Sequence, residues 1–556
     1  MRRYCSQVIV IGLWSMASAM ADEAPSVEAA IPEPMRSLGK PAMWEFPNGV
    51  RLAVSASSEL AQQHVNQGLN HLNGGWEFEA GRHFAAALRE DPECLLAHWG
   101  MVMSLIDPTP ETLEARDAAM ERLLDLIEAG AGTELERGYA YGLIKYIQEG
   151  PAVAANVFRK VAEKFPNEVQ AGLLAALFGR GGYDPSGEAT PDQETSEKQL
   201  RELMEAHPLN PVPVHALLFI RAEAPVTGET LAMARSLVLR WRDYPPYHHL
   251  LGHYEWRDGN FPEAVTAFSR AASLYQEWMT EQQAGLADCP EWLKAESYRI
   301  VAMLSAGETE AALAAANELA ATPLIKERPA SAGNRFLLWE VKSLPARILM
   351  SRNISGNAAK AAATLPKPEV AAAFRGESLA YWWLDGLRLL LEGRRQLDDK
   401  KTDGARELLA ALDHHGEAMA RTRNIALAGG EISPWSRAFR GIEVLVGELR
   451  GDVALAGSEP LRASAFNWFS SAAERQAPAS LLMPPAVLSP MAARLGDYHL
   501  AAGKPADAVE AYQRALALFA NHIDVLTSLQ RAYDAAGESA EAAATARKIE
   551  SLKDGR

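Results

Sequence analysis

The sequence predicts an all-α protein, an α-solenoid built from repeated helical hairpins. Three observations carry this prediction: alanine-rich segments, apolar residues at helical spacing, and a near absence of alternating β-branched stretches. Alanine is the strongest helix former, and it is small enough to let neighbouring helices approach closely. With 48% hydrophobic and 23% charged residues in 556 positions, the chain can bury a core, which excludes wholesale disorder.

The first 21 residues have the three parts of a bacterial-type signal peptide. Arg2 and Arg3 give a positive start, residues 8–14 form a short apolar core, and residues 19–21 are Ala-Met-Ala, a cleavage pattern. The alternative is a buried N-terminal helix. We expect cleavage between Ala21 and Asp22 and export of the mature chain to the periplasm or the extracellular space. No later apolar run is long enough to span a membrane, so we expect no transmembrane segment in the mature chain.

Charge and cysteine content restrict the partners and the covalent links. The formal net charge is −16, and it becomes −18 once Arg2 and Arg3 are removed. An acidic surface repels phosphate backbones, so we expect no nucleic acid partner. Cys94 and Cys289 remain after cleavage; an oxidising compartment allows one disulfide between them, and two buried free thiols are the favoured alternative.

Residues 22–60 are expected to form an irregular N-terminal arm. They contain prolines and alanines with few periodic apolar positions, and residues 47–49 (Pro-Asn-Gly) indicate a turn. The first helix is expected to begin at about residue 61.

From there, small and aromatic residues recur in a fixed register. Gly68, Ala80, Phe84 and Pro92 stand at positions 8, 20, 24 and 32 of a 34-residue unit. This spacing resembles the tetratricopeptide repeat, in which small residues let two helices pack closely and the proline ends the second helix. The register returns in three later pairs: Gly142 with Phe158, Gly252 with Phe268, and Gly496 with Tyr512.

The repeats divide the mature chain into three predicted regions. An N-terminal tetratricopeptide-like solenoid covers residues 61–320, a region of degenerate helical repeats covers 331–455, and a C-terminal pair of repeats covers 485–551. Two loops, 179–195 and 352–369, are expected to interrupt the array. Residues 477–490 contain four prolines and are expected to form a stiff connector.

Three passages resemble a group of bacterial exported tetratricopeptide-repeat proteins of uncharacterised function. They are residues 67–100, with the phrases Gln-Gly-Leu-Asn-His-Leu and Asp-Pro-Glu-Cys, residues 246–265, which carry histidines, and residues 478–509. The middle third shares only the helical texture. The resemblance implies a helical solenoid and export, and it implies no particular reaction.

One histidine cluster is the candidate site. His249 and His253 occupy positions 5 and 9 of a first repeat helix, one turn apart, where such repeats line their concave groove; Trp256 and Arg257 follow on the same helix. His215 precedes His249 by one 34-residue period, so its ring is expected to lie beside theirs.

Three interpretations of this cluster stay open. The groove can receive a peptide tail or carboxylate through hydrogen bonds and stacking on His215, His249, His253, Trp256 and Arg257. Alternatively, the three imidazoles bind Zn or Cu. The third interpretation is that the histidines are half-buried packing residues that bond to neighbouring helices.

The chemistry-bearing motifs of common enzyme classes are missing from the sequence, including G-x-S-x-G, H-E-x-x-H and Walker A. We therefore expect a scaffold without catalytic residues or cofactor that binds a protein or peptide in its concave groove. The alternative is a metal-binding or hydrolytic all-helical protein that uses His215, His249 and His253. The sequence leaves the oligomeric state open.

Overall fold

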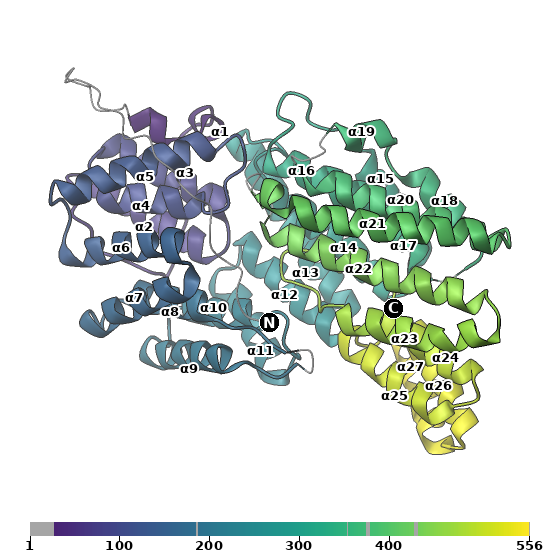
Figure 1. Ribbon diagram of the computed structural model, residues 1–556. Helices are drawn as coiled ribbons and strands as arrows, with labels where there is room; N and C mark the ends of the chain where they lie inside the picture. The colour runs from purple at the N-terminus through teal and green to yellow at the C-terminus, as the bar shows by residue number, and fades with distance from the viewer. Residues whose placement is uncertain (1–26, 185–186, 353, 374–377, 428–431, 555–556) are drawn as a thin grey trace.

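The computed structural model describes residues 27–184, 187–352, 354–373, 378–427 and 432–554 (Figure 1). Within these ranges the chain consists of helices and loops, and the sole β-type pairing is one isolated bridge between Tyr183 and Ala189. The predicted all-α solenoid class is confirmed. The predicted signal peptide, with cleavage between Ala21 and Asp22, lies outside the described residues.

The N-terminal region is a run of antiparallel helical pairs preceded by a short 3-10 turn. Its elements are η1 (Val27–Ala30), α1 (Glu33–Arg36), α2 (Glu59–Asn73), α3 (Glu77–Glu90), α4 (Leu95–Ser104), α5 (Leu113–Glu128), α6 (Glu134–Glu149), α7 (Pro151–Lys164), α8 (Val169–Gly179), α9 (Pro191–Ala206), α10 (Val212–Ile220), α11 (Gly228–Arg240), α12 (Pro245–Asp258), α13 (Phe261–Gln282), α14 (Pro290–Ser305) and α15 (Thr309–Ala321).

The middle and C-terminal regions continue the array with four short helices, three long ones and the helices of the last hairpins. Their elements are α16 (Ala332–Trp339), η2 (Val341–Ser343), α17 (Leu344–Met350), α18 (Asn357–Thr364), α19 (Pro368–Ala372), α20 (Leu379–Asp398), α21 (Thr402–Leu427), α22 (Ile432–Leu455), α23 (Glu459–Arg475), α24 (Met491–Ala501), α25 (Pro505–Leu518), α26 (Ile523–Ala536) and α27 (Ser539–Asp554). Figure 1 shows α24 to α27 in yellow, beside α23.

The predicted repeat register is present in the packing of the helical pairs. A Cβ added to Gly68 would lie 2.7 Å from the ring of Phe84, sixteen residues later, on the partner helix. The same relationship, at 2.5 to 2.8 Å, holds for the pairs Gly142 with Phe158, Gly252 with Phe268, and Gly496 with Tyr512. Each glycine therefore allows an aromatic ring of the second helix to lie directly on the backbone of the first, which is the tetratricopeptide-type hairpin.

The segment between α1 and α2 is irregular, and amide side chains of α2 fix its backbone. Asn70 accepts a hydrogen bond from the amide of Val50 at 2.8 Å and donates one to its carbonyl at 2.9 Å. Gln67 forms the equivalent pair of bonds with the backbone of Trp44. Because these side chains satisfy backbone groups that no strand or helix satisfies, the arm can pack in an extended form.

Two predicted loops are partly helical. Within 179–195 helix α9 begins at Pro191, because the side chain of Thr190 accepts a hydrogen bond from the amide of Gln193 and proline is favourable in a first helical turn. Within 352–369 the alanine-rich segment Asn357–Thr364 forms α18. Helix α23 lies between the predicted second and third regions, where the repeat pattern assigned no element.

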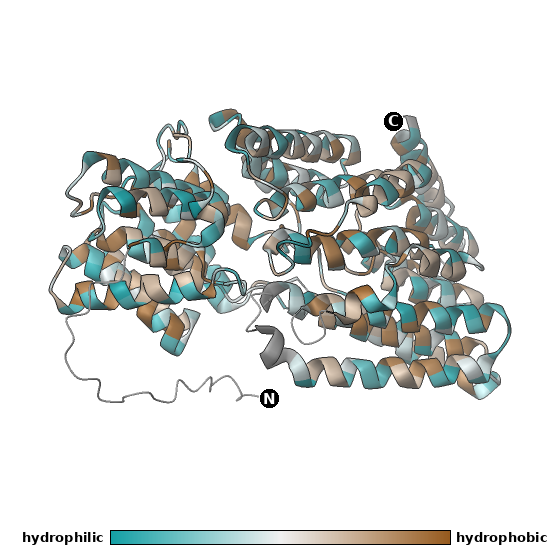
Figure 2. Cartoon of the chain, turned by 90° about the horizontal axis from the view of Figure 1, so that it is seen from above, coloured by the Kyte–Doolittle hydropathy of each residue, from teal (hydrophilic) through white to brown (hydrophobic). Residues whose placement is uncertain are grey.

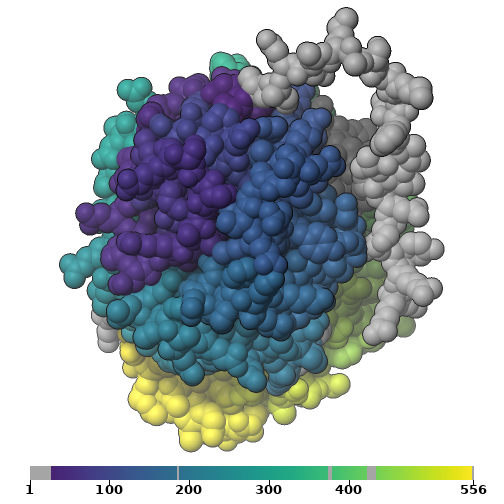
Figure 3. Space-filling model, turned by 90° about the vertical axis from the view of Figure 1, so that its left-hand side faces the viewer, coloured from purple at the N-terminus to yellow at the C-terminus, as the bar shows by residue number. Residues whose placement is uncertain are grey.

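The hydrophobic cores follow the array in chain order. The first core joins the arm to helices up to α14, the second joins α12 to α22, and the third joins α22 and α23 to the last four helices. Figure 2 shows hydrophobic and hydrophilic residues alternating around most helices, as amphipathic packing requires. Figure 3 shows the N-terminal helices as a continuous face, with the C-terminal helices emerging below it. No described helix combines the length and apolarity that a membrane span needs.

Candidate functional site

A cavity of about 560 Å³ lies between the N-terminal helices, α22 and the connector that follows α23. Its wall comes from four segments that are far apart in the sequence, within residues 180–193, 219–223, 436–444 and 475–487. This volume is within the range of about 300–1,000 Å³ that is usual for ligand sites. Ligand sites commonly form where separate parts of a fold meet, as they do here.

Four arginines line this cavity: Arg180 after α8, Arg437 and Arg440 one turn apart on α22, and Arg475 at the end of α23. Among the described residues that line it, Glu223 is the single carboxylate. We call these four residues the arginine cluster. A protein with a formal net charge of −16 therefore gathers positive charge at this cavity.

Two members of the arginine cluster are held by neighbours. Arg437 forms an ion pair with Glu223, and its other terminal nitrogen donates to the carbonyl of Pro478 at 3.3 Å. Arg475 lies 3.6 Å from Glu443 of α22. Arg475 also donates to Ser471 on its own helix. Because a guanidinium has five N–H donors, both groups keep donors for a ligand.

The other two members are less engaged. Arg180 lies over the ring of Phe219, with its guanidinium carbon 5.7 Å from the ring centroid. The wall around it lowers its pKa by partial desolvation, although the side chain still reaches solvent and stays charged. Arg440 is exposed and forms no ion pair or hydrogen bond within the part of the chain that the structure describes. A bound anion at Arg440 would thus displace water and would break no bond of Arg440 to another described residue.

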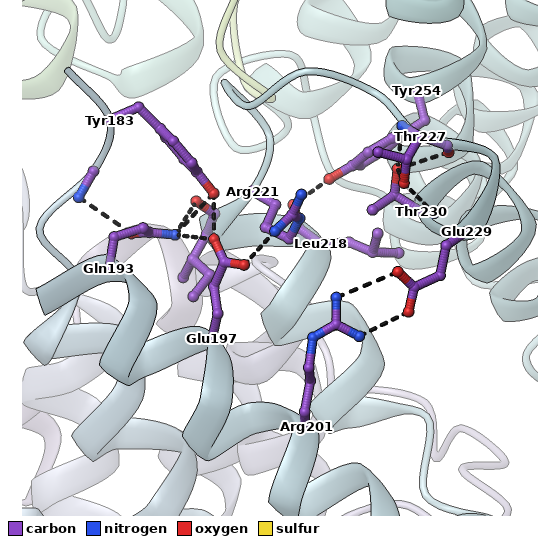
Figure 4. A network of polar contacts seen from close by, with 12 residues as sticks. Tyr183, Gln193, Glu197, Arg201, Leu218, Arg221, Thr227, Glu229, Thr230 and Tyr254 are labelled. Carbon is purple, nitrogen blue, oxygen red and sulfur yellow. Dashed lines mark hydrogen bonds and ion pairs between the residues drawn. The ribbon is translucent and has the colours of Figure 1, made fainter. Parts of the chain in front are cut away.

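A polar network holds Tyr183 and Gln193 in the cavity wall (Figure 4). The Tyr183 hydroxyl donates to Glu197, which is also paired with Arg221, and Gln193 donates to the Tyr183 hydroxyl and to the carbonyl of Ile220 at 3.1 Å each. Desolvation and the Glu197 carboxylate raise the pKa of Tyr183. The tyrosine is therefore a fixed neutral wall residue.

His253 and Arg257, two residues of the predicted groove, lie behind the opposite part of the wall. Nε2 of His253 is 2.9 Å from the carbonyl oxygen of Ala222, to which Arg257 also donates at 2.6 Å. The second terminal nitrogen of Arg257 donates to the carbonyl of Ala224 at 3.0 Å. Together these bonds fix the turn that carries Glu223 into the cavity.

His249 supports the connector in the same way. Its Nε2 lies 2.7 Å from the carbonyl oxygen of Leu481, and the Tyr298 hydroxyl donates to the carbonyl of Met483 at 2.8 Å. Burial lowers the pKa of His249 to about 4, with the nearby charge of Lys294 acting in the same direction and the Leu481 carbonyl against it. At neutral pH the ring is uncharged, so its Nε2 must carry the proton that it donates.

The remaining two predicted residues are also buried. The ring of His215 is 5.2 Å from that of Tyr247, with an interplanar angle of 24°, and burial lowers the pKa of His215 to about 4. Nε1 of Trp256 donates to the Ser305 hydroxyl at 2.9 Å.

The structure therefore brings His249, His253 and Arg257 into one layer behind the cavity wall. Within the described ranges, His215, His249 and His253 do not bring three ligand atoms within 4.8 Å of one another. The shared Zn or Cu site predicted at these three histidines is not formed, because Nε2 of His249 and Nε2 of His253 are directed at different backbone carbonyls. Direct contact of the predicted residues with a peptide stays a prediction.

The arginine cluster was missed by sequence reasoning. Arg437 and Arg440 share a helix face at a spacing of three residues, which is the one local signal that the sequence offers. Arg180 and Arg475 come to the same cavity only through the fold, from segments nearly three hundred residues apart.

The arrangement can bind anions. Guanidinium groups form short, charge-assisted and often bidentate hydrogen bonds with carboxylates and phosphates, and they stay charged at any physiological pH. Apolar residues such as Phe219, Leu482 and Val487 line the same cavity and offer contact surface between the charged positions.

No family model matches the chain, and no curated protein matches it. Solved structures of low similarity include a human IFIT1 dimer with PPP-AAAA, which is 11% identical, with 92% of this chain and 98% of that chain covered and a TM-score of 0.34. Yeast Tom70 is 11% identical over 87% of this chain and 90% of its own, with a TM-score of 0.27.

Proposed function

We propose that this protein is a scaffold that binds an acidic segment of a partner protein in the arginine-lined cavity. The observation that carries the proposal is the arginine cluster, four guanidinium groups around one cavity with a single lining carboxylate in a chain of net charge −16. Carboxylate side chains of a bound segment would accept hydrogen bonds from these guanidinium groups, and in particular from Arg440. Binding without catalysis is part of the proposal.

The size and lining of the cavity favour a peptide segment over a single small anion. One water molecule accounts for about 30 Å³ of liquid, so 560 Å³ has room for several side chains. The cavity also combines charged walls with apolar ones, which suits an acidic sequence that contains apolar residues. Helical repeat folds often bind peptides, so the proposal agrees with the usual use of the fold.

A matched pair of peptides tests the proposal. A fluorescent peptide of about eight residues with glutamates between leucines is compared by fluorescence anisotropy with its glutamine counterpart, at low and at physiological salt. We expect binding of the acidic peptide that weakens as salt rises, because ionic screening acts on exposed charges. We expect Arg440→Gln to weaken binding at least tenfold, since a charge-assisted hydrogen bond contributes about 1.5–3 kcal/mol.

Arg462→Gln is the matched control, because Arg462 is an exposed arginine near the other end of α23 and is not part of the cavity wall. It should leave the affinity unchanged. The proposal fails if both peptides bind equally, or if Arg440→Gln and Arg462→Gln have the same effect. Inorganic phosphate is added as a competitor: full displacement at millimolar phosphate would identify the cavity as a site for a small anion.

We also propose that the mature chain begins at Asp22 and works outside the cytoplasm. The support is the signal-peptide pattern of residues 1–21. Expression of the full chain in a bacterium, followed by cell fractionation and N-terminal sequencing, should find Asp22 as the first residue of a periplasmic or secreted product. A cytoplasmic product that keeps residues 1–21 would contradict this.

A further inference from the structure

The first helical hairpin contains a group of buried ligand-type side chains that the arginine cavity does not use. His71 lies on α2, and Glu79 and His83 lie one turn apart on α3. One ligand atom from each residue lies within 4.8 Å of the other two, and all three side chains are fully buried. Within the described ranges this is the only such set of three histidine, cysteine or acidic residues.

Four polar atoms of this group have no hydrogen-bond partner among the described residues. They are both ring nitrogens of His71, Oε1 of Glu79 and Nε2 of His83. A buried polar atom without a partner costs free energy, and native proteins rarely leave several together. Four such atoms in one place indicate that a ligand is part of the folded protein.

The other side-chain polar atoms of His83 and Glu79 are already held by partners. Nδ1 of His83 lies 3.0 Å from Nδ1 of His64, and Oε2 of Glu79 forms a 2.7 Å ion pair with Arg82. Arg82 in turn donates to the carbonyl of Gly39 at 3.0 Å. Metal ligands in proteins are typically oriented in this way, by a second partner on the atom that does not face the metal.

We propose that His71, Glu79 and His83 form a binding site for one divalent transition-metal ion, closed between the two helices of the first hairpin. Two imidazoles and one carboxylate are a usual ligand set for Zn²⁺, with a water or another group in the fourth position. Tetrahedral ligands at about 2.0–2.2 Å from the ion stand about 3.3 Å apart. The three groups thus need to approach by at most about 1.5 Å, which side-chain torsions allow.

The protonation states suit a metal ligand set. Burial lowers the pKa of His71 to about 3 and holds that of His83 well below its usual range, so both rings are neutral and have a free lone pair. The backbone of Ala42 acts on the pKa of His83 in the opposite direction and raises it, but by less than burial lowers it. Burial raises the pKa of Glu79, and the ion pair with Arg82 and the nearby indole of Trp278 lower it.

Aromatic rings of the N-terminal arm close the group off from solvent. The ring of His71 is 5.6 Å from that of Trp44 and 5.0 Å from that of Phe46. Tyr244, which precedes α12, lies on the same ring at 5.7 Å. A metal ion could enter or leave only when the arm opens, so exchange with a chelator should be slow.

The test uses the mature chain purified without a histidine tag. Its metal content is measured, and the metal-free chain, prepared by unfolding with a chelator and refolding, is titrated with Zn²⁺ and with Co²⁺ as a spectroscopic probe. We expect one equivalent to bind, a rise in the thermal midpoint, and a zinc absorption edge that fits nitrogen and oxygen ligands. Binding weaker than millimolar, or a sulfur-containing ligand shell, would overturn the proposal.

Variants locate the site. Glu79→Gln and His83→Gln are expected to weaken Zn²⁺ binding at least a hundredfold, and His64→Gln ten- to a hundredfold because it removes the partner of a ligand. His98→Gln is the matched control: His98 is buried on the next helix, with Nε2 bonded to the Pro92 carbonyl at 2.9 Å. Zinc binding that survives both ligand substitutions would also overturn the proposal. If a variant does not fold, the metal content and absorption edge of the unmodified chain still decide.

Discussion

Nε2 of His249 lies 2.7 Å from the carbonyl oxygen of Leu481, 232 residues away in the sequence. The histidine belongs to a repeat helix of the N-terminal region, and the leucine belongs to the connector that lines the arginine cavity. This one hydrogen bond therefore couples the protonation of a buried ring to the shape of the candidate site.

The His249 ring should make the protein sensitive to acid. Its pKa is about 4 when folded against about 6.5 when unfolded, so the unfolded chain binds the proton first as pH falls. The stabilisation is complete above pH 6.5 and is lost progressively down to about pH 4. A shift of this size corresponds to roughly 3 kcal/mol, at 1.36 kcal/mol per pKa unit. His249→Gln keeps a donor for Leu481 but cannot titrate.

Urea unfolding at pH 7 and pH 4.5 checks this prediction. The difference in unfolding free energy between the two pH values should shrink by roughly 3 kcal/mol at most in His249→Gln. His414→Gln, a change at an exposed histidine of α21, should leave the difference as it is. An equal acid sensitivity in His249→Gln and the unmodified chain would contradict the assignment.

Phe84 should tolerate no side chain on the glycines that face it. A Cβ on Gly100 would stand 2.2 Å from its ring, and one on Gly68 would stand 2.7 Å away. Gly100→Ala is therefore expected to destabilise the protein by about 1–3 kcal/mol through overpacking. Gly228→Ala, at a position where an added Cβ meets nothing within 4 Å, should be neutral. The midpoints of urea unfolding of the two variants decide, and equal midpoints would contradict the close approach.

The sequence was sufficient for the fold because the repeat is a local pattern. Gly68 and Phe84 stand sixteen residues apart, and that interval is set by two helices and one turn. Long α22 and short α18 could not be assigned so well, because their packing contacts do not follow the sixteen-residue interval. Gly451 of α22 meets the ring of Phe469, eighteen residues later, and α18 contains no glycine. The repeat signature contains no residue that reports those contacts.

The candidate site was predicted less well, for a physical reason. A repeat register places His249 and His253 on the groove side of their helix, but it says nothing of the connector and the turn that cover them. The arginine cluster and the group of His71, Glu79 and His83 differ in how much local sequence signal they offer. Glu79 and His83 share one helix face, a signal at hand in the sequence, whereas Arg180 and Arg475 meet only in the folded chain.

Cys94 and Cys289 should be free thiols that do not react in the folded protein. Both are buried and unpaired, and burial raises the pKa of Cys94 to about 12 and that of Cys289 well above its usual range. Because the thiolate is the reactive form, a thiol reagent such as dithionitrobenzoate should label neither residue before unfolding and both after it. Failure to label two thiols of the mature chain in denaturant would indicate a disulfide instead.

Glu340 and Arg347 form a buried ion pair. Replacing one of the two residues should lower the free energy of unfolding more than replacing both. Nη1 of Arg347 donates to Glu340 at 2.6 Å, both side chains are at most 2% exposed, and Nη2 donates to the Pro485 carbonyl in the cavity wall. Arg347→Met leaves the Glu340 carboxylate buried without a counter-ion and is expected to cost about 3–5 kcal/mol.

The double change of Arg347→Met with Glu340→Met separates the charge effect from lost packing. Replacing both charges by apolar side chains removes the desolvation cost together with the attraction, so the double variant should be more stable than Arg347→Met alone. The loss that persists in the double variant reports the bond to Pro485, and the same variant should show weakened acidic-peptide binding because the connector is less fixed. Unfolding free energies from urea titrations of the four proteins measure the coupling. A loss in the double variant equal to the sum of the two single losses would show that the pair contributes no such coupling.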